Sequence, residues 1–216
     1  MTVVIGMVAE GTHDYLMLEP AIRVELEQRL NDTVQFRHLQ PMPDATGTYS
    51  DGGYSQVVTW CSRFAGVGIE TFYKPLFAGD RPCDFVVVHM DGDALEDVRS
   101  HTSVVFPDPV PPDKRVSIGV RVIEAWLNLS PERRSTLAIA VPVLHSEAWI
   151  LGAEGVANCE AIDAKALLRS THSRQAHGTM AVFYGTRAKA AAPAIAAMQL
   201  SPSYLAFKAE LSVLTL

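Results

Sequence analysis

Short apolar runs and helical apolar patterns alternate along this chain, and they predict strands and helices in turn. Residues 3–8 form a continuous run rich in β-branched side chains, which is typical of a strand covered on both faces. After a polar turn, apolar side chains recur every four residues from Leu18 to Leu30, which predicts a helix with Thr12 as its cap. Residues 84–90 have the strongest strand pattern in the sequence, and they end abruptly in Asp-Gly-Asp.

The rest of the chain continues this alternation. Residues 41–54 are dense in Gly, Pro, Asp and Ser, which predicts a long loop, and a second, Pro-rich loop covers 106–113. Because apolar strands alternate with helices, we expect an α/β fold: a mainly parallel, Rossmann-like sheet flanked by helices, with a helical C-terminal part. The two remaining strands are expected at 34–37 and 136–143. Further helices are expected at 55–66, at 118–129, from 146 onward and, in pieces, from 161 onward.

Length and composition bound the class of protein. The 216 residues fit a single domain, with a core over about 1–155 and a helical extension over about 156–216. Apolar residues make up 48% and charged residues 19%, which argues against disordered, collagen-like and coiled-coil chains. The N-terminus lacks the basic flank of a signal peptide, and the longest uncharged stretch, 190–207, contains two prolines. We therefore expect a cytoplasmic protein without a membrane-spanning segment.

The charged residues and the cysteines narrow the possible partners. The formal net charge is −6, from 24 acidic and 18 basic residues. A chain this acidic is a poor binder of nucleic acid or of a membrane surface through bulk charge alone. Cys61, Cys83 and Cys159 are scattered and lack CxxC spacing, which excludes a zinc site built mainly from thiolates and argues against a disulfide framework.

Four carboxylates follow directly on predicted strands. Glu10 lies just beyond the first strand, and Asp91 and Asp93 lie just beyond the strand with the strongest pattern. Glu147 follows the last predicted strand, and Asp14 lies about one helical turn after Glu10. Because the carboxyl ends of parallel strands meet at one edge of a sheet, where ligands bind, we expect these side chains to share a crevice.

Carboxylates this close repel one another unless a cation neutralises them, and hard oxygen ligands suit Mg²⁺ or Mn²⁺. Gly92, between the two aspartates, lets a ligand or the backbone approach closely. Each signal alone has another explanation, since Asp-x-Asp also occurs in turns and Glu147 also complements the dipole of the helix that it starts. Their occurrence at successive strand ends favours a shared metal site.

At these residues the chain resembles a Toprim domain, the metal-binding fold shared by topoisomerases, primases and OLD-family nucleases. Such domains carry a glutamate after the first strand, often within Glu-Gly-x-x-Asp/Glu, and an Asp-x-Asp after a later strand. The matching residues here are Glu10-Gly11-Thr12-His13-Asp14 and Asp91-Gly92-Asp93. The resemblance implies a single Toprim-like domain over 1–216.

The chain looks most like a family of small stand-alone Toprim-like proteins, some of which accompany ATPases in bacterial defence loci. That family has a third block that begins Glu-Ala-Trp, matched here from Glu147. It also has a lysine-bearing helix followed by Ser-Pro-Ser and an aromatic residue, matched by Lys189 and Ser201–Tyr204. The family's acidic residue after the Trp block is Ala153 here, with Glu154 the nearest substitute, which leaves open whether the site holds one cation or two.

The resemblance implies a metal-dependent nuclease that hydrolyses phosphodiester bonds in DNA or RNA. Glu10, Asp91 and Asp93 would be direct ligands of Mg²⁺ or Mn²⁺. Glu147 and Asp14 would complete or bridge the site. Glu10 has an alternative role as general base, which sequence does not separate from ligation.

Some further residues have both a functional and a structural explanation. Lys189 would stabilise the charge on the pentavalent phosphate, or it is a solvated lysine on a helix. His13, His89 and His145 flank the same strand ends and are candidates to bind metal or phosphate, against the alternative of solvent-facing or hydrogen-bonded histidines. Trp149 is expected to pack in the core.

The expected partners follow from the same resemblance. We expect a nucleic-acid substrate, DNA in preference to RNA, and an ATPase partner or a homo-oligomer to supply the affinity that the acidic chain lacks. Two other classes of function stay open. One is a non-catalytic module that binds a nucleotide, nucleic acid or a partner ATPase. The other is a nucleotide-sugar transferase, which also uses Asp-x-Asp but gives Glu10 no role.

Overall fold

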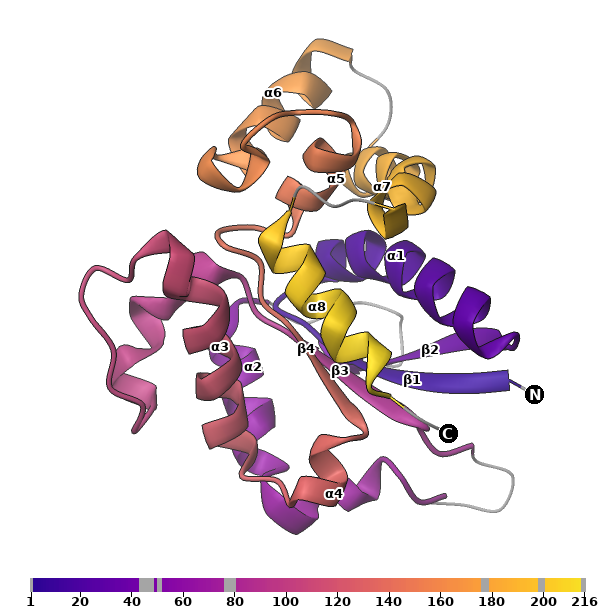
Figure 1. Cartoon of the computed structure of the whole chain (residues 1–216), viewed down its shortest axis with the longest axis vertical. Helices are drawn as coiled ribbons and strands as arrows, with labels where there is room; N and C mark the ends of the chain where they lie inside the picture. The colour runs from indigo at the N-terminus through magenta and orange to yellow at the C-terminus, as the bar shows by residue number, and fades with distance from the viewer. Residues whose placement is uncertain are drawn as a thin grey trace.

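The fold is an α/β sandwich built on one parallel sheet (Figure 1). Within the described part of the chain the sheet has four strands in the order β2-β1-β3-β4, which confirms the predicted fold class. The strands are β1 (Thr2–Val8), β2 (Thr33–Gln40), β3 (Phe85–His89) and β4 (Leu137–Ala140). The computed structural model describes residues 2–42, 49, 52–75, 81–175, 179–197 and 201–214.

The strand order contains a switch point between β1 and β3. The chain passes from β1 to β2 on one side and then returns to place β3 on the other side of β1. Ile5 pairs with Phe85 and Val86 pairs with Leu137, so the three strands that precede the predicted carboxylates lie side by side. In such sheets the crevice at a switch point, beyond the carboxyl ends of the strands, is where ligands bind.

Helices cover both faces of the sheet. Alternate strand side chains such as Ile5 and Met7 pack under one group of helices, while Val4, Val8 and Val86 face the other group. The first group is α1 (Thr12–Leu30), α5 (Glu147–Ala153), α7 (Met180–Ala197) and α8 (Pro202–Ser212), and the second is α2 (Tyr54–Arg63) and α3 (Pro112–Leu127) (Figure 1). The shorter elements are α4 (Pro131–Arg134), α6 (Ala164–Gln175) and 3₁₀ turns at Gly66–Thr71, Gly92–Leu95, Asp97–His101 and Cys159–Ala161.

The C-terminal helices belong to the same hydrophobic core as the sheet. Tyr204 and Phe207 of α8 are fully buried, and the ring of Trp149 stacks on Phe207 with 5.6 Å between centroids. Trp149 Nε1 donates a hydrogen bond of 2.8 Å to Ser203 Oγ, so Trp149 packs in the core as expected. The hydroxyl of Ser201 caps α8 by accepting the Tyr204 N–H. The Ser-Pro-Ser-aromatic block thus anchors α8 against α5.

Helix starts differ from the sequence prediction in two places. The N-cap of α1 is Gly11, not Thr12, and the Asp14 carboxylate accepts the Gly11 N–H at 2.8 Å. Helix α3 starts six residues earlier than predicted, at Pro112, because proline at the first helical position loses no hydrogen bond. Most of the predicted loop at 41–54 lies outside the described residues. None of the helices in the described part of the chain combines the length and apolar character that a membrane crossing requires.

The turn after β3 packs tightly against the segment after β4. A Cβ atom on Gly92 would lie 2.3 Å from the carbonyl oxygens of both Pro142 and Val143. Asp93 N donates a hydrogen bond of 3.3 Å to the carbonyl of Leu144. The predicted close approach at Gly92 is therefore confirmed, and it is made by backbone.

We expect Gly92→Ala to lower the free energy of unfolding by about 2 kcal/mol, because two carbonyls must move to admit the methyl group. Gly185→Ala is the matched control. A Cβ there meets only Leu16 Cδ2 at an ordinary 3.7 Å, and alanine is the better helix former by about 0.5–1 kcal/mol. Urea denaturation of both variants measures the difference, and equal stabilities would contradict the tight packing at Gly92.

Candidate metal centre

The carboxyl ends of β1, β3 and β4 bring the predicted acidic residues together. Glu10 follows β1, and its Oε1 accepts a hydrogen bond of 2.8 Å from the backbone N–H of Asp91, which follows β3. The backbone N–H of Ser146, which precedes α5, donates to Asp91 Oδ1 at 3.1 Å. Asp91, with 2% of its surface exposed, thus joins the segments that follow all three strands.

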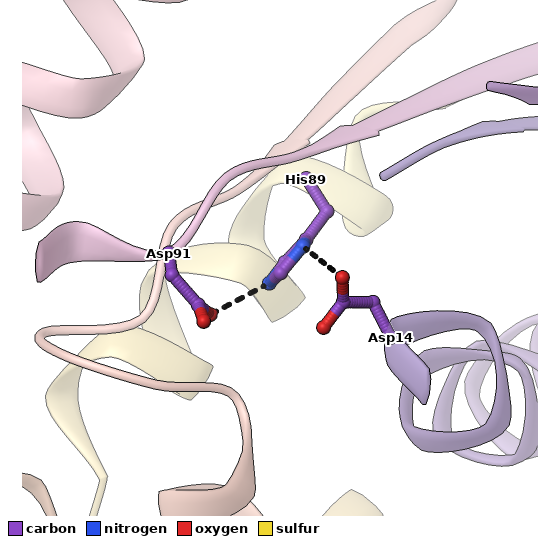
Figure 2. A group of neighbouring side chains, drawn as sticks. All are labelled: Asp14, His89 and Asp91. Atoms are coloured by element: carbon purple, nitrogen blue, oxygen red, sulfur yellow. Dashed lines mark ion pairs between the residues drawn. The ribbon is translucent and has the colours of Figure 1, made fainter. Parts of the chain in front are cut away.

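His89 lies fully buried between two of these carboxylates (Figure 2). Its Nδ1 is 3.9 Å from Asp14 Oδ2, and its Nε2 is 3.4 Å from Asp91 Oδ1. Neither ring nitrogen makes a hydrogen bond within the described part of the chain. Asp14, His89 and Asp91 lie close enough together to hold one metal ion.

A second group of potential ligands shares Asp91 with the first. His145 Nδ1 lies 3.5 Å from Asp91 Oδ2 and 3.4 Å from Asp93 Oδ2. Asp91, Asp93 and His145 also lie close enough together to hold an ion. Asp91 offers one oxygen to each group, as a carboxylate that bridges two cations would.

A lysine enters the site from a segment remote in sequence. Lys165, in the first turn of α6, places its Nζ 2.6 Å from Asp91 Oδ2. Lys189, the lysine expected either to stabilise the phosphate or to be solvated, is an exposed residue of α7. Of these two lysines, Lys165 is therefore the one that contacts Asp91. Its position in a polar helix gave no sequence signal, because only the path of the chain after α5 returns it to the sheet edge.

The other predicted residues fall around the two groups. Glu147 starts α5 and is buried, and its Oε2 has no hydrogen-bond partner among the described residues. Glu154, the nearest substitute for the acidic residue absent at Ala153, pairs with Arg187 of α7. His13 is exposed and packs its ring against Tyr184, 5.3 Å between centroids. Glu154 and His13 thus contact residues other than the potential ligands of the two groups.

Charge concentrates on Asp91. Burial alone would raise the pKa of Asp91, but the close polar contacts and positive charge of His145, His89 and Lys165 hold that pKa well below its usual range. Burial, with the charge of Asp91 next in size, raises the pKa of Glu10 to about 8. Burial lowers the pKa of His89 in isolation, yet the facing carboxylates of Asp14 and Asp91 outweigh it and raise that pKa to about 9.

The pKa values of the remaining carboxylates in the cluster are raised, like that of Glu10. Burial first, and the charge of Asp91 after it, raise the pKa values of Asp93 and Glu147. For Asp14, burial and Asp91 outweigh the opposing charge of His89 and raise the pKa. The cluster thus holds one firmly ionised carboxylate among several that bind protons readily, as expected where carboxylates are crowded together.

Cation binding should therefore release protons and strengthen as the pH rises. Glu10 and His89 must lose protons to face a cation, and their pKa values of about 8 and about 9 place this loss above neutrality. We expect the affinity for Mn²⁺ to increase from about pH 6.5 to about pH 9 and then level off. Titration calorimetry at about pH 7 in two buffers of different ionisation enthalpy counts the released protons. An affinity that stays flat over this range would contradict the charge arrangement.

No protein-family model matches the chain, and neither a curated protein nor a solved structure matches it. What the protein does must therefore be inferred from the geometry and charge of its own residues.

Proposed function

We propose that the protein is a nuclease that hydrolyses phosphodiester bonds with Mg²⁺ or Mn²⁺. The observation that carries the proposal is the pair of ligand groups that share Asp91. One of them includes the buried ring of His89, whose nitrogens make no hydrogen bond to the described residues. Paired cations bridged by a carboxylate are the recurrent device of phosphodiester hydrolysis. The shared carboxylate favours two cations over one.

The residues present fit a cation. A buried polar nitrogen without a partner costs free energy, and a metal ion would relieve this cost at His89. Asp91 Oδ1 lies 3.4 Å from His89 Nε2, close to the separation of about 3 Å expected between neighbouring ligands of one octahedral ion. Asp14 Oδ2 lies 3.9 Å from the other ring nitrogen, Nδ1, and one ion would bind only one of the two nitrogens. Carboxylates suit Mg²⁺ and Mn²⁺ equally, whereas imidazole nitrogen shifts the preference toward a transition metal, and hence toward Mn²⁺.

The chain's own residues supply the other requirements of the reaction. A bound divalent cation would polarise the phosphate and lower the pKa of bound water. Glu147 offers a buried carboxylate oxygen that is free to accept a proton, and Glu10, with its raised pKa of about 8, offers a second general base. The ammonium of Lys165 would stabilise the negative charge that develops on the phosphate.

The two alternatives differ in what they require of Glu10 and of the substrate. A nucleotide-sugar transferase gives Glu10 no role, and the hydrogen bond that Glu10 accepts from the Asp91 backbone N–H weighs against it. A non-catalytic module would use the same cluster to bind a nucleotide, nucleic acid or an ATPase without cleavage. We propose DNA as the preferred substrate, a role in bacterial defence, and an ATPase partner or homo-oligomer. Two bound cations would add four positive charges to a chain of formal net charge −6, which eases the approach of a polyanion.

Cleavage of DNA or RNA oligonucleotides by the purified chain should require Mg²⁺ or Mn²⁺ and should depend on Asp91. We expect Asp91→Asn to reduce cleavage at least about 100-fold, because it removes the charge that both ligand groups share. Asp93→Asn, at a carboxylate 46% exposed, should cause a loss without disturbing the core. Asp97→Asn is the matched control, since Asp97 is exposed and lies outside both groups.

Cleavage that survives both Asp91→Asn and Asp93→Asn would exclude the proposed mechanism. Binding of Mn²⁺ and of oligonucleotide without any cleavage, by the chain alone and with an added ATPase partner, would favour the non-catalytic module.

The role of Lys165 is tested separately. Lys165→Ala should reduce kcat roughly 100-fold, because it removes charge that stabilises the transition state. It should not weaken Mn²⁺ binding, since the ammonium competes with the cation for Asp91 Oδ2. Lys74→Ala, at an exposed lysine paired with Glu70, is the matched control. A larger loss in Lys189→Ala than in Lys165→Ala would return the role to Lys189.

A further inference from the structure

A cavity of about 750 Å³ opens beside the acidic cluster, within the size range of small-ligand pockets. It lies between the start of α3, the segment after β4, the connection from α5 to α6 and the start of α8. Neither ligand group includes a residue of its wall. Its lining includes Arg115, Val116, Leu144, Val156, Asn158 and Glu160.

The cavity and the cluster share backbone. Leu144 lines the cavity, its carbonyl accepts the Asp93 N–H at 3.3 Å, and the next residue is His145 of the second ligand group. Arg115 also lines the cavity and donates a hydrogen bond of 2.5 Å to the carbonyl of Gly92. A ligand seated in the cavity therefore lies next to the turn that carries Asp91 and Asp93.

The charges in the cavity wall indicate whether a charged or a neutral group of a ligand would enter. Among the described residues of the lining, Arg115 is the one with a cationic side chain, and its guanidinium is already bound by Glu96 at 2.6 Å and 3.0 Å. The wall also carries the carboxylates of Asp113 and Glu160. An anionic group has no unpaired cation to meet there and two carboxylates to repel it. The cavity thus suits a neutral group.

The rest of the lining suits a flat, mostly apolar group with polar edges. Val116, Val143, Leu144 and Val156 supply apolar surface. Asn158 is exposed at the wall, and its amide offers both a donor and an acceptor. A side-chain amide of this kind pairs with the edge of a nucleobase, as asparagine does with adenine.

We propose that this cavity holds the base of a terminal or unpaired nucleotide whose phosphate lies at the acidic cluster. The inference rests on the proposed function, because the divalent cations that the cluster would hold are what attract the phosphate. A base inside a duplex is stacked and paired, so it reaches such a cavity only at a strand end, in a single strand or after unpairing. The protein's substrates are thus nucleic-acid ends, single strands or short nucleotides. The contact with the base supplies affinity that the acidic surface does not.

The test compares ligands that share a phosphate and differ in the base. Calorimetric titration of the full chain with Mn²⁺ uses adenosine 5′-monophosphate and ribose 5-phosphate as probes. We expect the nucleotide to bind about tenfold more tightly than the sugar phosphate, from burial of one aromatic base. Mn²⁺ alone is titrated first, so that the cation site is measured independently of the cavity.

Ala157→Trp fills the cavity from its wall. Ala157 lines the cavity and is exposed, so the larger side chain is tolerated by the fold. The variant should bind adenosine 5′-monophosphate no better than ribose 5-phosphate, with unchanged affinity for Mn²⁺. Ala209→Trp, at an exposed alanine of α8 outside the cavity, is the matched control and should keep the preference for the nucleotide.

Equal binding of the two probes, or a preference that Ala157→Trp leaves intact, would overturn the inference and leave the proposed function standing if Mn²⁺ still binds. Failure of Mn²⁺ to bind would overturn the proposed function. In that case adenosine, which has no phosphate, is titrated without metal, and binding that Ala157→Trp abolishes would still support the base site. If an apolar dye occupies the cavity and adenosine 5′-monophosphate does not displace it, the occupant is apolar and the inference is overturned.

Discussion

The carboxylate of Asp91 is the group on which this edge of the molecule depends. An ionised carboxylate with 2% of its surface exposed is tolerated only where hydrogen bonds and opposite charges replace water. Here Lys165, the Ser146 N–H and the two imidazoles of His89 and His145 surround it. These groups come from β3, the segment after β4, and α6, so the charge of one residue fixes how three parts of the chain meet. Removing any of them leaves a buried charge less compensated.

The same arrangement connects stability to chemistry. In the structure, positive side chains balance Asp91 while neighbouring carboxylates retain protons, as the raised pKa of Glu10 shows. Under the proposed function a divalent cation takes over part of this balance, which frees the Lys165 ammonium for the substrate. The C-terminal helix α8 helps to position Glu147. Trp149 of α5 donates a hydrogen bond to Ser203 of α8, and the Ser203 hydroxyl donates one to Glu160. Helix α8 thus fixes α5, which begins at Glu147. The part expected as an extension therefore shapes the centre.

Much of the fold and part of the candidate metal centre could be predicted from sequence, because both depend on patterns among residues that are close together in the chain. Strand and helix patterns are set by the spacing of apolar residues, and parallel strands gather the residues that follow them at one edge. Glu10, Asp91 and Glu147 were therefore placed near one another without any knowledge of contacts. His89 was a candidate ligand on the same grounds, and it belongs to the first ligand group. It lies two residues after Val87, on the strand face that packs against α1, and it is the one imidazole in a buried apolar run.

The sequence by itself determined the sheet, the helices and the gathering of carboxylates at the strand ends, because periodicity and strand direction are properties of neighbouring residues. The tertiary structure alone decided which lysine enters the centre, that Asp91 is shared by two ligand groups, and that a cavity opens beside them. Lys165 is 74 positions from Asp91. The cavity wall combines α3 with segments on either side of α5 and the start of α8. Such contacts depend on how remote segments pack and on where side chains point, and no local pattern encodes either.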